Sequence, residues 1–158
     1  MIQVEGILNS RPLTPLSIDT DDFQVLTPGH FLIGRPINSL PEPNLIDKKE
    51  NRLNKWEKVQ KMVQTVWKFW RNNYLSHLQQ RNKWQFKKQN VKIGMMVILK
   101  DSNLPVGKWP LGRITNVFPG ADSNIRVVDV KTSTGQFRRP ISKICILPIN
   151  DNTEAKTA

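Results

Sequence analysis

The side chains with the most obvious chemistry in this sequence are its lysines and arginines, whose cationic groups bind phosphate oxygens. The chain has 24 Lys and Arg against 13 Asp and Glu, a formal net charge of +11 at pH 7. The excess lies in residues 48–100, where 14 Lys and Arg face only Glu50 and Glu57, a net charge of +12. Residues 1–47 hold 2 basic and 6 acidic residues, a net charge of −4. A chain this basic attracts polyanions, and nucleic acid is the first partner that we expect.

Side chains that bind metals or act as nucleophiles are scarce. Cys145 is the only cysteine, so no CxxC pair exists, and the two histidines, His30 and His77, lie far apart in the sequence. We therefore predict no metal and no cofactor. We expect Cys145 to be a small core residue, His30 to pack or to form hydrogen bonds, and His77 to be exposed. No apolar stretch approaches the roughly 20 residues that span a bilayer, so we expect no membrane partner.

The first 47 residues offer little regular structure to position a site. Val4, Ile7 and Leu8 have helical spacing, but prolines and glycines interrupt every later pattern in this stretch. Its apolar residues, such as Phe31, are too many for a free linker, and we expect them to pack against another surface. We assign residues 1–47 as an irregular N-terminal segment, mostly loop.

Residues 48–90 contain no glycine or proline and predict a basic helical linker. Large apolar residues recur every three or four positions, with Trp67, Trp70 and Tyr74 at the centre of the stripe. The pattern allows one long amphipathic helix or a helix pair with a break near residues 72–73. We interpret the aromatic stripe as a packing face rather than a surface for base stacking.

Residues 91–149 change to the alternating pattern of β-strands, separated by turn-forming clusters. The expected strands are residues 96–100, 111–117, 125–130, 136–139 and 144–147. Five short strands in a segment of this length predict a small β-barrel, which Trp109 is expected to plug. The fold class is therefore α+β, and residues 150–158 are expected to be a disordered tail.

A barrel buries one face of each strand and leaves the other face free for cations. The expected phosphate contacts are Lys87, Lys88, Lys108, Arg113, Arg126, Lys131, Arg138 and Arg139. Such contacts neutralise the phosphate backbone and give salt-sensitive binding that depends little on base sequence.

The same segments resemble a known family. VKIGMMV at 91–97, KWPLGR at 108–113 and RVVDVKT at 126–132 resemble the C-terminal integrase-associated domain of unknown function of Bel/Pao-type retrotransposon integrases. NSRPLT at 9–14 and LTPGHFLIGRP at 26–36 resemble the end of the catalytic core of the same proteins. The resemblance implies the remnant of an RNase-H-like core in residues 1–47, the helical linker, and a five-stranded Src-homology-3-like barrel.

The resemblance also implies DNA integration by two metal ions on three carboxylates, but the residues here do not supply that site. The family's carboxylates are expected upstream of the matching motifs, so Glu5 is not the third one. Asp19, Asp21 and Asp22 belong to a turn-rich loop without the rigidity that two-metal chemistry needs, and we read them as solvated charge. We therefore expect no catalysis by this chain and no small-molecule substrate.

Three hypotheses remain open. The first is a DNA-binding module of a retrotransposon integrase, with the nucleus as its compartment and the cytoplasm as the alternative. The second is a protein-interaction module, either for histone tails, for which Trp109, Phe118 and Phe137 supply few cage aromatics, or for self-association through the Trp-rich helix face. The third is a truncated transposon fragment without a function of its own.

Overall fold

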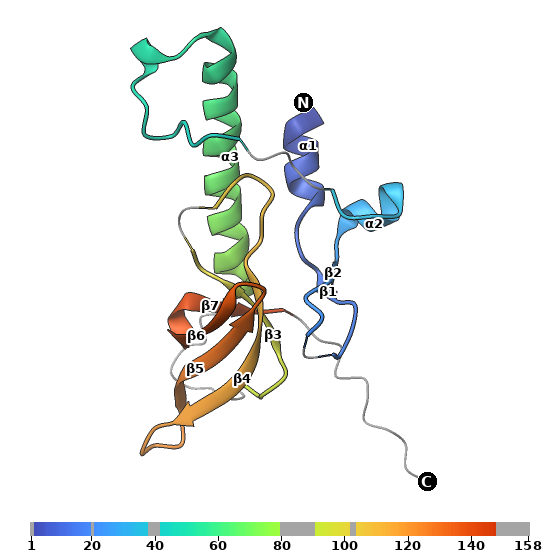
Figure 1. Cartoon of the computed structure of the whole chain (residues 1–158), viewed down its shortest axis with the longest axis vertical. Coiled ribbons are helices and arrows are strands. Elements are labelled where there is room, and N and C mark those ends of the chain that lie inside the picture. Colours follow the sequence, from blue (N-terminus) through green and yellow to red (C-terminus); the bar gives the residue numbers. More distant parts are fainter. Residues whose placement is uncertain (1, 20, 38–41, 80–90, 102–103, 148–158) are drawn as a thin grey trace.

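The protein is a mixed α+β structure in which a long helix contacts a five-stranded antiparallel sheet and the N-terminal segment lies beside both (Figure 1). The computed structural model describes residues 2–19, 21–37, 42–79, 91–101 and 104–147. The helices are α1 (Ile2–Asn9), α2 (Pro28–Ile33) and α3 (Lys55–Leu78), with 3-10 turns η1 (Glu50–Arg52) and η2 (Ile141–Lys143). The strands are β1 (Thr14–Pro15), β2 (Val25–Leu26), β3 (Met96–Leu99), β4 (Leu111–Pro119), β5 (Ile125–Thr132), β6 (Gly135–Pro140) and β7 (Ile144–Ile146). The tail that we expected at residues 150–158 lies outside the described residues.

Helix α3 is one continuous element, without the break near residues 72–73 that the sequence allowed. It begins with a capping box, in which the Asn54 side chain accepts from the Glu57 backbone N–H at 2.8 Å and Glu57 accepts from the Asn54 backbone N–H at 2.9 Å. The helix continues because its packed face is held on both sides of the asparagines, with Arg71 and Leu75 both buried. Residues 80–90 lie outside the described residues, and with them the end of the expected linker.

The sheet confirms the five strands that the alternation predicted, in the order β6-β5-β4-β3-β7. All neighbours are antiparallel, and the last strand of the chain pairs with the first strand of the sheet. Gly112 permits the close approach of β4 and β5, because a Cβ at this position would meet the Val130 side chain at 2.4 Å. The register between β4 and β5 shifts after Ile114 and again after Phe118, as it does at β-bulges.

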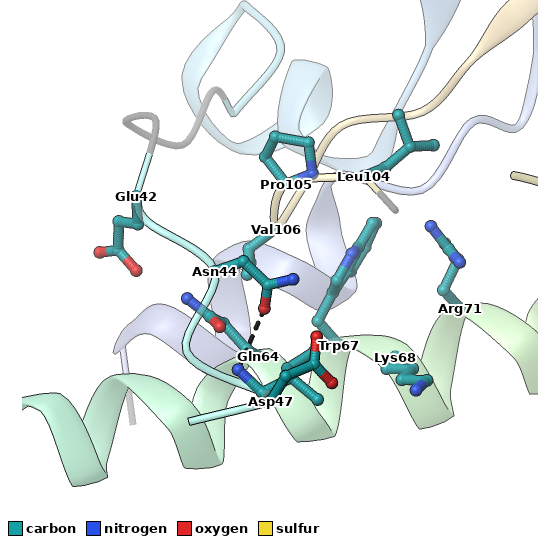
Figure 2. Close-up of a pocket in the computed structure, with 11 residues that line it drawn as sticks. Glu42, Asn44, Asp47, Gln64, Trp67, Lys68, Arg71, Leu104, Pro105 and Val106 are labelled. Carbon is teal, nitrogen blue, oxygen red and sulfur yellow. Dashed lines mark hydrogen bonds between the residues drawn. The ribbon is translucent and has the colours of Figure 1, made fainter. Parts of the chain in front are cut away.

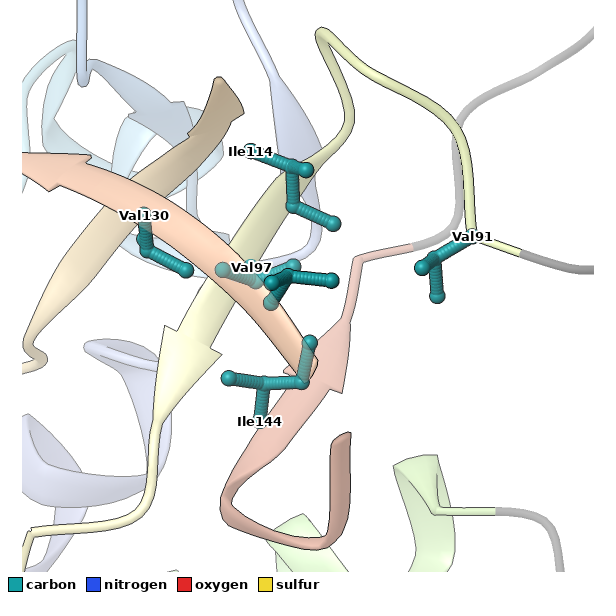
Figure 3. Packing of buried hydrophobic residues seen from close by; sticks show 6 residues of the cluster. Val91, Val97, Ile114, Val130 and Ile144 are labelled. Carbon is teal, nitrogen blue, oxygen red and sulfur yellow. The ribbon is translucent and has the colours of Figure 1, made fainter. Parts of the chain in front are cut away.

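Each face of the sheet carries its own apolar core. Val97, Ile114, Val130 and Ile144 gather on one face with Val91 (Figure 3), and none of these side chains is more than 5% exposed. The second core lies on the opposite face, against α3. It consists of Leu75, Met96, Ile98, Cys145 and Leu147, which confirms the prediction that Cys145 is a small core residue. Adjacent residues of β3 therefore serve different cores, as the period of two requires.

The N-terminal segment is more ordered than the sequence suggested. The prediction of a short helix is confirmed by α1, but β1 and β2 also pair, and Ile7 and Leu45 are buried. Gln64 of α3 holds the segment through two hydrogen bonds, accepting from the Leu45 backbone N–H and donating to the Pro43 carbonyl, each at 2.9 Å. The apolar side chains of α2 stay exposed, with Phe31 at 73%.

Candidate nucleic-acid interface

Arg113 is not on an outward face, so that part of the sequence prediction is wrong. Its side chain is only 2% exposed. One terminal nitrogen donates to the Gly94 carbonyl at 2.9 Å, and the other donates to the carbonyls of Ser17 and Asp22, both at 3.0 Å. Arg113 therefore fastens the 16–24 loop to the sheet instead of offering a charge to phosphate.

Three further candidates on the sheet are exposed but already paired with acidic side chains. Arg126 pairs with Asp122 at 2.5 Å, Lys131 pairs with Asp21, and Arg138 pairs with Asp129 at 2.8 Å. The hydrogen bond from Arg138 lowers the pKa of the Asp129 carboxyl, and the same bond raises the pKa of Arg138. A phosphate must compete with these carboxylates, so this face is weaker as an anion site than a count of its cations indicates.

Lys108 and Arg139 remain exposed without an acidic partner among the described residues. Lys108 lies in the loop between β3 and β4. Arg139 of β6 lies over the Phe137 ring, with its guanidinium carbon 5.4 Å from the ring centre, and donates to the Arg138 carbonyl. Lys87 and Lys88, the other two expected contacts, lie outside the described residues.

The central part of the aromatic stripe of α3 packs inside the protein, which supports its interpretation as a packing face there, whereas Trp56 at the start of the helix is 61% exposed. Trp109 makes edge-on contacts with Trp67, Trp70 and Tyr74, with ring centres 5.0, 5.9 and 5.5 Å apart. Trp109 thus joins the β3–β4 loop to the helix. This corrects our prediction that Trp109 plugs the interior of the barrel. Its indole N–H donates to the Ser10 hydroxyl at 3.3 Å, which adds α1 to the same junction. This part of the Trp-rich face is not free for self-association.

A cluster of cations that the sequence did not reveal lies where α3 meets one end of β3. The hollow there has a volume of about 240 Å³, and we call it the cationic groove. It is lined by Lys68, Arg71, Asn72, Leu75, Ser76, Lys100, Asp101 and Lys143. Four cations thus face a single acidic residue of the lining.

Backbone contacts fix the geometry of the cationic groove. The Lys100 backbone N–H donates to the Lys143 carbonyl at 2.8 Å, which keeps these two lysines side by side. Gln79, at the end of α3, donates to the carbonyls of Ser142 at 3.0 Å and Ile144 at 2.7 Å, and it accepts a hydrogen bond from the Lys100 ammonium group. The groove is therefore built from three elements that the fold holds together, α3, β3 and η2.

The acidic loop shows no arrangement suited to metal chemistry. Asp19 and Asp22 accept hydrogen bonds from backbone N–H groups of their own loop, and Asp21 pairs with Lys131. Across the described ranges no three His, Cys, Asp or Glu side chains come together in a way that could hold a metal ion. The Nδ1 atom of His30 receives the Thr27 backbone N–H at 3.0 Å at the start of α2, which confirms its expected role in hydrogen bonding, and His77 is exposed as expected.

Comparison with known proteins identifies a family for this architecture. Residues 54–147, which include α3 and the entire five-stranded sheet, match the model described as Family of unknown function (DUF5641). The chain belongs to this family. No curated protein and no solved structure matches the chain. None of the helices in the described ranges has the length and apolarity that crossing a membrane requires.

Proposed function

We propose that this protein is a nucleic-acid-binding module that contacts the phosphate backbone through the cationic groove. The observation that carries the proposal is the convergence of Lys68, Arg71, Lys100 and Lys143 on one hollow with Asp101 as its only acidic lining residue. Phosphate groups neutralise such a cluster and release the counterions condensed on the nucleic acid, which gives salt-dependent and largely sequence-independent binding. Lys108 and Arg139 are the two exposed cations of the sheet segment that extend this role.

The resemblance to Bel/Pao-type retrotransposon integrases supports DNA as the nucleic acid. An integrase must hold diverse target sequences through their common backbone, and backbone contacts serve that purpose. We therefore propose a binding role in DNA integration rather than catalysis by this chain, with the nucleus as its place of action. The resemblance also leads us to propose that the sheet closes as a Src-homology-3-like barrel.

The two cores support closure of the sheet. Helix α3 packs against one face, yet Val97, Val128 and Val130 on the other face are fully buried. The partly buried residues packed around the core on this other face all come from the sheet segment itself, which supports a sheet that curls over its own side chains. The two edge strands support closure as well, because the three residues of η2 connect β6 at one edge of the sheet to β7 at the other. In a flat sheet these edges would lie four strand spacings of about 4.8 Å apart.

Binding to labelled duplex DNA of random sequence across a range of salt concentrations tests the function. We expect Lys68→Gln, Lys100→Gln and Lys143→Gln together to weaken binding and to reduce the salt slope by up to about 2.7, since each lost phosphate contact removes about 0.9. The matched control is Lys55→Gln, Lys58→Gln and Lys92→Gln, which removes the same charge from exposed positions outside the groove. Equal losses of DNA affinity in the two triple variants would show that net charge alone attracts DNA, and the cationic groove would then have no special role.

Self-association is the second candidate function, through the exposed edge of the apolar helix face that the sequence predicted, beside its packed tryptophans. Val59, Met62, Val66 and Phe69 form a stripe along α3 and are exposed by 44%, 68%, 41% and 68%. Their spacing of three and four residues puts them on one side of the helix. We propose that two chains pair through this stripe. Sedimentation of Met62→Lys and Phe69→Lys, with His77→Lys as the control, should show dissociation in the first two variants alone.

A further inference from the structure

Arg71 and Trp67 present two buried N–H donors that have no acceptor. The Nε atom of Arg71 and the Nε1 atom of Trp67 are both enclosed, and the described residues offer neither of them a hydrogen-bond partner. The residues themselves are 4% and 2% exposed. Buried donors are nearly always satisfied in folded proteins, so two orphans one helical turn apart call for a specific explanation.

Arg71 differs from the other buried arginine in its terminal nitrogens. The Nε atom of Arg113 also has no hydrogen-bond partner, but the terminal nitrogens of Arg113 donate to three carbonyl oxygens. Within the described ranges Arg71 has no hydrogen bond, and its contacts are the Trp67 ring, 5.9 Å from the guanidinium carbon, and the electrostatic attraction of Asp101. Burial lowers the pKa of Arg71 and Asp101 offsets this only in part, so the cation is held at a free-energy cost.

The surroundings of Arg71 show from which side a ligand would arrive. Arg71 and Lys68 line both the cationic groove and a second hollow of about 160 Å³ beside Trp67 and the β3–β4 segment (Figure 2). The far part of that second hollow carries Glu42 and Asp47, which repel anions. The cationic groove is therefore the side from which an anion would reach Arg71.

We propose that Trp67 and Arg71 form a socket for one phosphate group of a bound nucleic-acid backbone, with the groove lysines as its approach. This inference rests on the proposed function and deepens it, since it separates one seated phosphate from general attraction by surface charge. Two donors one helical turn apart, neither with an acceptor among the described residues, can be satisfied by the oxygens of an oxyanion, and a guanidinium matches phosphate geometry better than an ammonium group does. Lys68 supplies further positive charge at the same place.

Nuclear magnetic resonance of the full chain tests the socket directly, because Arg Nε–H and Trp indole N–H groups give separate signals. Inorganic phosphate is titrated while sodium chloride is adjusted to keep the ionic strength constant. We expect the Arg71 and Trp67 signals to shift together and to saturate, whereas the indole signal of Trp109, which is bonded to Ser10, stays in place. A linear drift shared by all indoles, or no shift, would overturn the proposal. So would a saturable response to glutamate in the absence of one to phosphate, because the ligand would then be an acidic peptide.

The variant Arg71→Lys links the socket to nucleic acid, because it keeps the charge and loses the planar fork. We expect duplex DNA affinity to fall roughly tenfold, the difference expected for a strong charge-assisted hydrogen bond, with the salt slope unchanged. Arg52→Lys makes the same exchange at an exposed position in η1, outside the proposed binding surface, and should change affinity little. DNA affinity in Arg71→Lys equal to that of the unaltered chain would refute the socket while leaving backbone binding by the lysines intact. Absence of DNA binding by the unaltered chain would refute the proposed function itself, and a phosphate shift would then assign the socket to free phosphate.

Discussion

Replacing Arg113 by methionine separates its role as a structural anchor from the phosphate-binding role that the sequence predicted. Methionine keeps much of the aliphatic volume of the side chain and removes the three hydrogen bonds to the carbonyls of Gly94, Ser17 and Asp22. Each bond from a charged donor is worth about 1.5–3 kcal/mol net, and removing the buried cation returns several kcal/mol of desolvation. Since water can solvate two of the three carbonyls once the 16–24 loop lifts, we expect the free energy of unfolding to fall by about 3 kcal/mol.

Urea unfolding followed by tryptophan fluorescence measures this change, and hydrogen exchange locates it. We expect amide exchange to rise first in residues 16–24, because this loop loses its tie to β4. Arg139→Met is the matched control, since the same exchange at an exposed position should change stability by about 0.5 kcal/mol or less. If Arg113→Met were as stable as the control and instead bound DNA more weakly, Arg113 would be a phosphate ligand and its assignment as an anchor would be wrong.

Three further predictions address the junction of helix and sheet and the paired cations. Trp109→Ala should lower the free energy of unfolding by about 3 kcal/mol, because one ring contacts three others; urea unfolding measures this, and a loss below about 1 kcal/mol would contradict it. Burial raises the pKa of Tyr74, so its contribution to stability is present below the ordinary tyrosine pKa of about 10 and is lost as the pH rises through the raised value. The midpoint temperature of thermal unfolding should accordingly fall less steeply with rising alkaline pH in Tyr74→Phe than in the unaltered chain. Equal pH profiles of the two proteins would refute this. Asp129→Asn should release Arg138 and strengthen DNA binding with a steeper salt slope, whereas unchanged binding in a fluorescence anisotropy titration would show that phosphate does not reach Arg138.

The local pattern of the sequence predicted the elements well, because alternation and helical periodicity record which side chains face a core. All five strands of the sheet were predicted, and α3 was predicted apart from its continuity through residues 72–73. The alternation in β4 also predicted the correct side of the strand for Arg113, since its side chain lies on the face opposite that of Ile114. Its exposure was wrong because the 16–24 loop covers that face, and no strand pattern reports what a distant segment covers.

The cationic groove escaped prediction for a related reason. Lys68, Lys100 and Lys143 come from a helix, a strand end and a 3-10 turn, and each is an ordinary surface lysine in its own segment. Arg71 was hidden in the same way, because a single arginine on an apolar helix face gives no local sign of its missing partners. The charge count placed the excess in residues 48–100, which include Lys68, Arg71 and Lys100. The backbone hydrogen bond between Lys100 and Lys143 and the tertiary contacts of Gln79 bring these residues together with Lys143.

The pairing of β7 with β3 has a consequence for how the chain acquires its structure during synthesis. Ile144 completes the core on one face of the sheet, and Cys145 and Leu147 complete the core on the other. A ribosome therefore has to release nearly the entire β segment before either core closes, and until then β3 has an open edge towards other chains. Contacts over such sequence distances fold slowly, so the nascent protein passes through a stage that favours capture by chaperones.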